Sequence, residues 1–176
     1  MARIKLLEKD EVHPMVREIF QKTEDSGNEI LNLMKALAHS PKITRDLNRL
    51  GITLLLKGDL AHDLRELAIL RVGHLAKANY EQTKHVPIAL MAGVRQEQID
   101  ELSDWANSAG FGAKERAVLQ YTDEVAQNVR CSDKTFSKIK EYFSEKEIVE
   151  LTVTIGYYGM VCRTLETLDI ELEQGS

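Results

Sequence analysis

The sequence predicts an all-helical protein, and three observations support this fold class. Residues with high helix propensity dominate the chain, and proline occurs only 3 times in 176 residues. Apolar residues recur at helical spacing, and no segment keeps the strict apolar–polar alternation of a half-buried strand. The segments between these runs carry residues that end or begin helices, such as Gly27, Ser40 followed by Pro41, and Gly93. We therefore expect helices joined by short turns.

The boundaries of the expected helices follow from these signals. In chain order the helices cover residues 14–24, 30–38, 41–57, 62–77, 80–93, 96–106, 114–129, 133–143 and 145–172. Ser144 and Glu147 form the pattern of a capping box at the start of the last helix. Pro87 lacks a backbone donor, so we expect a kink or a break in the helix beside His85. The last four residues, 173–176, are expected to fray.

The fourth expected helix, residues 62–77, is the most apolar segment of the chain. Apolar residues surround almost its whole circumference, which predicts a buried helix. Its polar interruptions are Glu66, Arg71 and His74. Because a carboxylate in such an environment can carry protons, Glu66 is a candidate functional residue.

Composition and charge narrow the possible functions. The chain has 23 Lys and Arg residues against 28 Asp and Glu residues, a net charge of -5, with no extended basic segment. Nucleic acid is therefore not an expected partner, although a local arginine pair could still bind an anionic substrate. No apolar run approaches the roughly 20 residues that span a bilayer, and the N-terminus lacks the apolar region of a signal peptide. We expect a cytoplasmic protein with no membrane partner.

The chain is expected to form one domain over residues 1–176, because no low-complexity linker divides it. Its cysteines, Cys131 and Cys162, lie far apart in the sequence and form no CxxC motif. In a reducing compartment they are expected to be free thiols.

A group of polar residues could carry out acid–base chemistry. Glu81 and His85 are four residues apart and therefore share one helix face. Histidine is the usual general acid or base near neutral pH, and the phenol of Tyr80 could donate a hydrogen bond to a developing oxyanion. Arg65 or Arg71 could hold a substrate carboxylate in a bidentate pair.

Each of these residues also has a structural interpretation. Glu66 lies early in its helix, where the helix dipole favours a carboxylate. Glu81 and His85 could form an ordinary surface pair, Tyr80 could be a packing residue, and His74 could be a half-buried histidine with satisfied nitrogens. Spacing alone does not decide between these interpretations.

The segment from Arg65 to Val94 resembles the central signature of carboxymuconolactone decarboxylase-like proteins, which have the alkylhydroperoxidase D-like fold. The matching features are Arg65-Glu66, the aliphatic helix, Tyr80-Glu81, His85 and Ala92-Gly93. The resemblance implies a multi-helical domain with its signature in residues 62–107. It also implies a homo-oligomer, a trimer or a hexamer, that acts on a small molecule.

The resemblance also separates two branches of the family. Peroxidase members carry a CxxC pair at the positions of Ala78 and Glu81, with a proton relay at Glu66, Tyr80 and His85. Both sulfur atoms are missing here, and thiol peroxidase chemistry needs them. The resemblance therefore implies a branch without the peroxidase motif.

The predicted function is a cofactor-free lyase that acts on a small organic acid or lactone, as in aromatic catabolism. The expected catalytic residues are His85, Glu66, Tyr80 and Glu81, and the expected substrate-binding residues are Arg65, Arg71 and His74. The alternatives are a peroxidase-like oxidoreductase and a non-catalytic helical oligomer that binds a small molecule. A metal site at Glu66, Glu81 and His85 is not expected, because no HxxxH or Cys/His cluster supports it.

Overall fold

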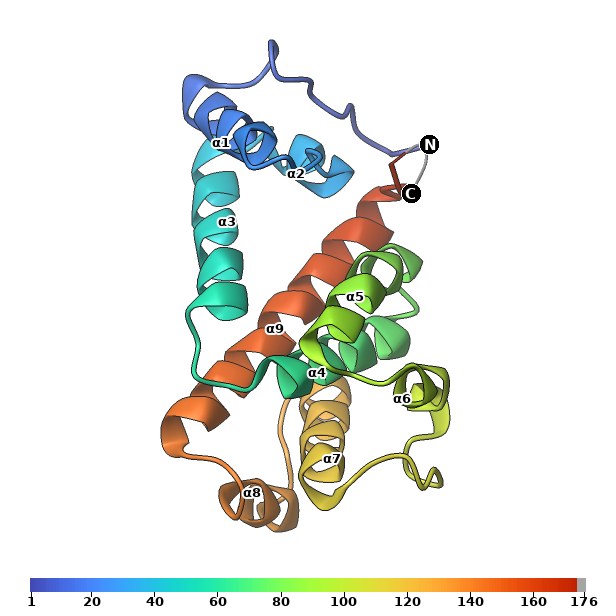
Figure 1. Cartoon of the computed structure of the whole chain (residues 1–176). Coiled ribbons are helices and arrows are strands. Elements are labelled where there is room, and N and C mark those ends of the chain that lie inside the picture. The colour runs from blue at the N-terminus through green and yellow to red at the C-terminus, as the bar shows by residue number, and fades with distance from the viewer. Residues whose placement is uncertain (174–176) are drawn as a thin grey trace. The chain divides into compact units, whose positions relative to one another are not determined.

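The computed structural model describes residues 1–173, and every regular element in this part of the chain is a helix (Figure 1). The elements are α1 (Pro14–Asp25), α2 (Asn32–Leu37), α3 (Pro41–Leu56), α4 (His62–Ala76), α5 (Asn79–Ala92), α6 (Gln96–Asp100), the 3₁₀ helix η1 (Leu102–Asp104), α7 (Ala113–Asn128), α8 (Asp133–Lys140) and α9 (Glu145–Leu168). The all-helical prediction is confirmed for the described residues. None of their helices has the length and apolarity needed to cross a membrane.

The helices belong to two compact units. One unit contains residues 1–56 together with the chain from Thr164 onward, and the other contains residues 57–163. In the first unit, one face of α1 packs on the start of the chain and on the α2 region. The core residues of this contact are Val12, Val16, Phe20 and Ala38, flanked by Leu7, Ile30 and Met34.

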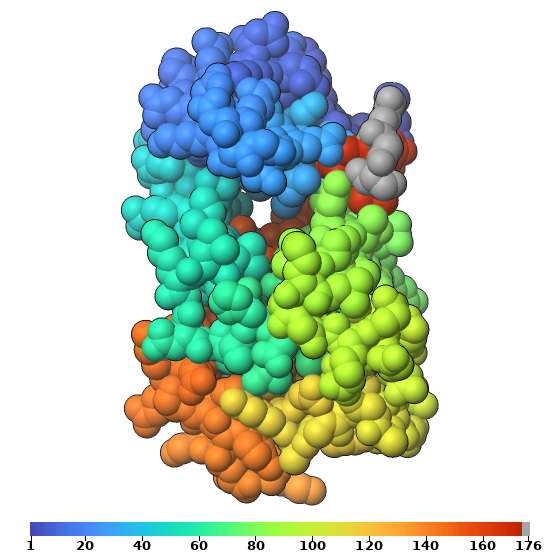
Figure 2. Space-filling model, in the orientation of Figure 1, coloured from blue at the N-terminus to red at the C-terminus, as the bar shows by residue number. Residues whose placement is uncertain are grey.

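The second unit is built around α4. All ten residues from Leu64 to Gly73 are buried, as predicted for a helix that is apolar on nearly every side. α4 packs against α5 on one side and α7 on another. In Figure 2 the light-green α5–α6 segment lies directly against α7, in yellow. Most of α9, up to Arg163, belongs to the same unit. There the Glu150 carboxylate accepts the backbone N–H groups of Asp59 and Leu60, both at 2.8 Å.

A tight turn brings α5 back along α4. Lys77 ends α4 in the left-handed conformation, with φ 55°, and the N–H of Ala78 donates to the carbonyl of Gly73 at 2.9 Å. A Cβ atom at Gly73 would lie 3.6 Å from Cβ of Glu81 and 3.4 Å from Cγ of Gln82. These are ordinary van der Waals distances, so the first turn of α5 packs directly on α4 at this point.

Local signals predicted most helix ends correctly. α3 begins at Pro41, and Gly93 ends α5 with φ 102°. Ser144 and Glu147 form the predicted capping box, in which the Ser144 N–H donates to the glutamate at 2.8 Å. Of the two outcomes predicted at Pro87, a kink or a break, the break is wrong, because α5 continues through this residue to Ala92.

Three predicted helices are too long. α8 stops at Lys140 instead of residue 143, and tertiary contacts or local turns explain the difference in the other two. α6 stops at Asp100 instead of residue 106, since the Arg71 guanidinium takes the carbonyls of Leu102 (2.9 Å) and Ser103 (3.4 Å). α9 stops at Leu168 instead of residue 172, where Asp169 turns the chain with φ 53°.

The predicted fraying of the C-terminus is wrong for the one tail residue that is described. Glu173 is buried and accepts the N–H of Asn32 at 2.6 Å. The remaining positions of the predicted frayed tail, 174–176, lie outside the described residues.

Candidate active site

A buried histidine in the second unit contacts a carboxylate through each of its ring nitrogens. Nδ1 of His85 lies 2.8 Å from Oε2 of Glu66, and Nε2 lies 3.1 Å from Oε1 of Glu81. His85 is 7% exposed, Glu81 is 4% exposed, and Glu66 has no exposed surface at all. The arrangement is therefore not the ordinary surface pair that the spacing of Glu81 and His85 also allowed.

The local sequence accounts for this geometry. Glu81 and His85 are four residues apart in α5 and so point from the same face. That face lies against α4, which carries Glu66 in its buried first half. Because α4 and α5 pack directly on each other, one imidazole contacts a carboxylate from each helix.

Arg65 adds a second cation. It is buried, and its Nε donates to the other oxygen of Glu66, Oε1, at 3.4 Å. Each oxygen of Glu66 therefore has one hydrogen-bond partner, Arg65 at Oε1 and His85 at Oε2. We call these four side chains the carboxylate–imidazole cluster: Arg65, Glu66, Glu81 and His85.

The environment favours the charged form of His85. Burial lowers its pKa, but the hydrogen bonds with Glu66 and Glu81 and the charges of these carboxylates outweigh that effect and raise the pKa to about 9. At neutral pH both ring nitrogens therefore carry protons, and each can donate to a carboxylate. The two cations of the cluster then balance its two carboxylates.

Two tyrosines of α9 complete the surroundings of His85. The ring of Tyr158 meets the imidazole edge to face, with centroids 4.9 Å apart and an interplanar angle of 86°. Tyr157 contacts Tyr158, with centroids 5.2 Å apart. Burial, with a smaller contribution from the negative charge of Glu81, raises the pKa of both phenols. They therefore remain neutral hydrogen-bond donors at physiological pH.

The sequence analysis missed both tyrosines. The available signal was the run Gly156-Tyr-Tyr-Gly159, two aromatic residues between glycines in a long helix. Nothing in that run points to His85, which lies far away in the chain and is reached only through the packing of α9.

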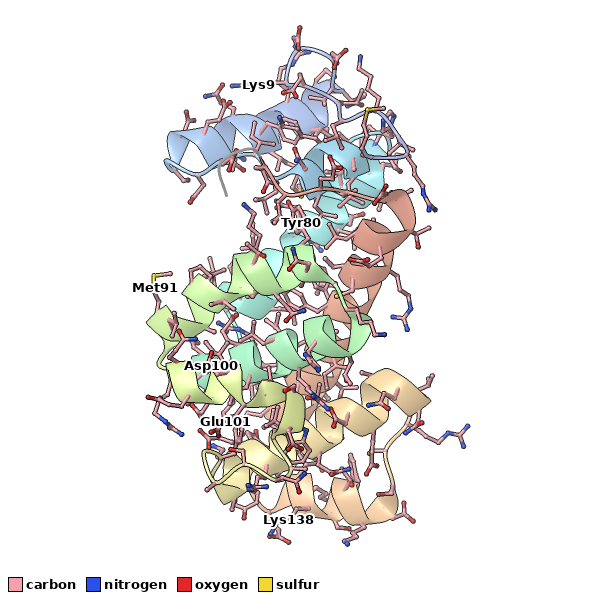
Figure 3. All side chains as sticks on the ribbon, turned by 90° about the vertical axis from the view of Figure 1, so that its right-hand side faces the viewer. Lys9, Tyr80, Met91, Asp100, Glu101 and Lys138 are labelled. Atoms are coloured by element: carbon pink, nitrogen blue, oxygen red, sulfur yellow. The ribbon has the colours of Figure 1, made fainter. Side chains whose placement is uncertain are left out.

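Tyr80 and His74 belong to the same two helices as the cluster, α5 and α4, but lie at other positions on them. Tyr80 is buried in the first turn of α5, and Figure 3 labels it there. It points about 100° around the helix axis from Glu81, as consecutive helical residues do. His74 is half-buried in the last turn of α4, about 12 Å along the axis from Glu66.

Arg71 makes a structural contact away from the cluster. Its Nε and Nη2 donate to the two oxygens of Asp123 at 2.6 and 2.9 Å, and Nη1 donates to the carbonyl of Leu102 at 2.9 Å. Trp105 donates its indole N–H to the same carboxylate at 3.1 Å. This guanidinium already donates to Asp123 and to backbone carbonyls. We therefore do not include Arg71 among the substrate-binding residues of the function proposed below.

The described residues also include potential metal ligands and both cysteines of the chain. Residues 1–173 contain no group of three or more His, Cys, Asp and Glu side chains arranged to hold a metal ion. Neither cysteine forms a disulfide. Burial and the nearby charge of Glu124 raise the pKa of the Cys131 thiol, which lowers its thiolate fraction. Cys162 is fully buried in α9.

Comparison with known proteins gives the same family as the residue pattern. The family model described as the carboxymuconolactone decarboxylase family matches residues 41–124, which include all four residues of the cluster. No match was found among curated proteins.

Solved structures show the same fold. A peroxidase-related protein from Ralstonia eutropha with an alkylhydroperoxidase D core has a TM-score of 0.87 at 18% identity, covering 98% of this chain and 93% of that chain. A putative antioxidant defence protein from Agrobacterium tumefaciens has a TM-score of 0.73 at 24% identity, covering 78% and 95%. The debrominase Bmp8, in complex with 2,3,4-tribromopyrrole, has a TM-score of 0.82 at 17% identity, covering 99% and 95%. Residues 41–124 therefore match the carboxymuconolactone decarboxylase family model, the chain has the alkylhydroperoxidase D-like fold, and its sequence lacks a CxxC motif.

Proposed function

We propose that this protein is a cofactor-free acid–base enzyme that acts on a small organic acid or lactone by proton transfer or decarboxylation. The observation that carries the proposal is the buried imidazole of His85 between the carboxylates of Glu66 and Glu81. Burying such a group is costly, and buried ion pairs are weak devices for stability. Titratable groups held together in this way are typical of sites that move protons.

The reaction needs three elements, and residues near His85 can supply them. Loss of carbon dioxide from an unsaturated lactone acid leaves an electron pair that is delocalised into a carbonyl. The enzyme must therefore bind the carboxylate, stabilise the oxyanion and return a proton. The cluster supplies proton-carrying groups. Tyr158, whose ring touches His85, is placed better than Tyr80 to donate to an oxyanion. Arg65, whose guanidinium lies beside Glu66, could hold a substrate carboxylate.

The first test is a spectrophotometric assay with 4-carboxymuconolactone. Wild type should turn the lactone over, and His85→Ala should lose about 100-fold or more of kcat, the usual contribution of a positioned acid–base group. The matched control is His62→Ala, which removes an exposed histidine at the start of the neighbouring helix, α4, and should retain wild-type turnover. Absence of turnover by wild type would contradict the decarboxylase reaction while leaving the family assignment unchanged.

A thiol-based oxidoreductase is the second candidate, and one observation favours it. Cys162 follows Tyr158 by four residues in α9 and therefore lies on the same face of that helix. Thiol peroxidases need a second cysteine to form a disulfide with the first, and the chain has no CxxC motif to supply it. We therefore place this function second.

Replacing both cysteines distinguishes the two candidates. We expect Cys131→Ser combined with Cys162→Ser to keep lactone turnover, because acid–base chemistry does not use sulfur. Peroxide consumption in the presence of a dithiol reductant should be the same with wild type, the double variant and buffer. Peroxide reduction by wild type that the double variant loses would favour the oxidoreductase. Cys162→Ala repeats the test with a smaller, apolar side chain at the buried position.

A further inference from the structure

The hydrogen-bonding groups of the cluster are not equally available to a substrate. Both nitrogens of His85 face carboxylates within 3.1 Å. Glu66 uses Oε2 for His85 and Oε1 for Arg65, and it has no exposed surface. Neither His85 nor Glu66 therefore has a proton-carrying atom free to meet a bound molecule.

Glu81 differs from both. Its Oε1 faces His85, whereas its Oε2 has no hydrogen-bond partner within residues 1–173. Within residues 1–173 this oxygen is also not among the fully enclosed side-chain atoms that lack a hydrogen-bond partner. Glu81 keeps 4% of its surface exposed. Its second oxygen is therefore both unbonded and in contact with solvent.

We propose that Oε2 of Glu81 is the atom that exchanges a proton with the substrate, and that His85 is a positioning residue behind it. This inference rests on the proposed acid–base function and names the group that performs it. The imidazole fixes Oε1 and so aims Oε2 outward, while Glu66 and Arg65 fix the imidazole from the other side.

The charge balance of the cluster indicates the chemical class of substrate. In the forward step a C–H bond beside a carbonyl breaks, the proton goes to Oε2 of Glu81, and the electron pair moves into the carbonyl to give an enolate. The cluster changes from neutral to a charge of plus one as the substrate gains a charge of minus one, so the two attract each other. In the return step the carboxylic acid gives its proton to carbon. A carbonyl compound that is uncharged at the reacting end, such as a lactone or ketone, fits this step best.

The test uses a probe that needs only an accessible base. Nitrobenzisoxazole opens when a base removes its carbon-bound proton: the C–H bond breaks, the electron pair forms a nitrile, the N–O bond breaks, and a coloured phenolate leaves. Wild type should accelerate this reaction over buffer. Glu81→Gln, which keeps the shape but cannot hold the proton, should lose about 100-fold or more of kcat/KM. Glu97→Gln, the same change at an exposed position of α6, should behave as wild type.

Two further variants separate catalysis from positioning. Glu81→Asp restores a carboxylate and should react faster than Glu81→Gln. His85→Gln should keep part of the rate, because the base is still present. The acid limb of its rate–pH profile should move to higher pH, since the carboxylate has lost the positive charge beside it. A purely structural role would lower the rate equally at every pH.

Several results would overturn the inference. Wild type that reacts no faster than buffer would mean that no open base exists at Glu81. Wild-type rates in folded Glu81→Gln, combined with a complete loss in His85→Gln, would make the histidine the base. Probe turnover without turnover of 4-carboxymuconolactone would remove the lactone as substrate and leave the role of Glu81 standing, so the two proposals fail separately.

Discussion

Replacing Asp123 by alanine is expected to lower the free energy of unfolding by about 3–5 kcal/mol, because it leaves the Arg71 guanidinium buried without a counter-charge. Arg71 is 7% exposed and makes a bidentate pair with this carboxylate. The change also removes the acceptor of the Trp105 indole N–H. Denaturant unfolding at neutral pH, followed by far-UV circular dichroism, measures the effect.

The chain offers a matched control for this prediction. Arg45 and Asp46 also form a bidentate pair, at 2.8 and 2.9 Å, but both side chains are exposed. Asp46→Ala should therefore change the free energy of unfolding little, since solvent screens an exposed pair. Equal effects of Asp46→Ala and Asp123→Ala would show that burial of the ion pair is not the cause.

A double variant tests the origin of the cost. Arg71→Met combined with Asp123→Leu removes both charges and replaces them with apolar volume. It should be more stable than Asp123→Ala alone, because the largest part of the cost is the uncompensated charge and not the lost pair. A double variant that is less stable than the single one would assign the loss to packing around α4 and α7.

The fold could be predicted from local signals wherever one residue decides a helix end. Pro41 at a first helical position, Gly93 at a left-handed position and the Ser144–Glu147 box each act within one turn of chain. The length of α6 could not be predicted in this way. The carbonyls of its expected continuation are bound by Arg71, whose position depends on tertiary packing.

In the candidate site, too, the sequence could predict residues related by local spacing but not those brought together by tertiary packing. Glu81 and His85 are joined by helical spacing, and Glu66 was singled out because it interrupts an apolar helix, so the sequence could place all three in one hypothesis. Tyr158 has no local relation to them and reaches His85 only through α9. Arg71 had the same sequence signal as Glu66, a charge in an apolar helix. Arg71, however, pairs with Asp123 of α7 and not with the cluster.

Raising the pH from about 6 to about 10 is expected to remove up to about 3 kcal/mol of stability through His85. The pKa of His85 is about 9 in the folded protein and 6.5 in the reference state, so the folded form binds the additional proton. This contribution is complete below pH 6.5 and is lost as the pH rises through about 9. Glu66 and Glu81 raise the pKa against the effect of burial. Tyr158, on the third side of the ring, stays neutral because its own pKa is raised.

The measurement compares unfolding free energies of wild type and His85→Gln across this pH range. Wild type should lose stability relative to the variant as the pH rises, because the variant has no proton to lose at this position. His62→Gln, which changes an exposed histidine, should follow wild type. If the difference between wild type and His85→Gln does not depend on pH, then His85 is not held as a cation. In that case the charge balance that suits Glu81 to an uncharged carbonyl substrate would be wrong as well, since it counts the imidazolium as one of the two positive charges.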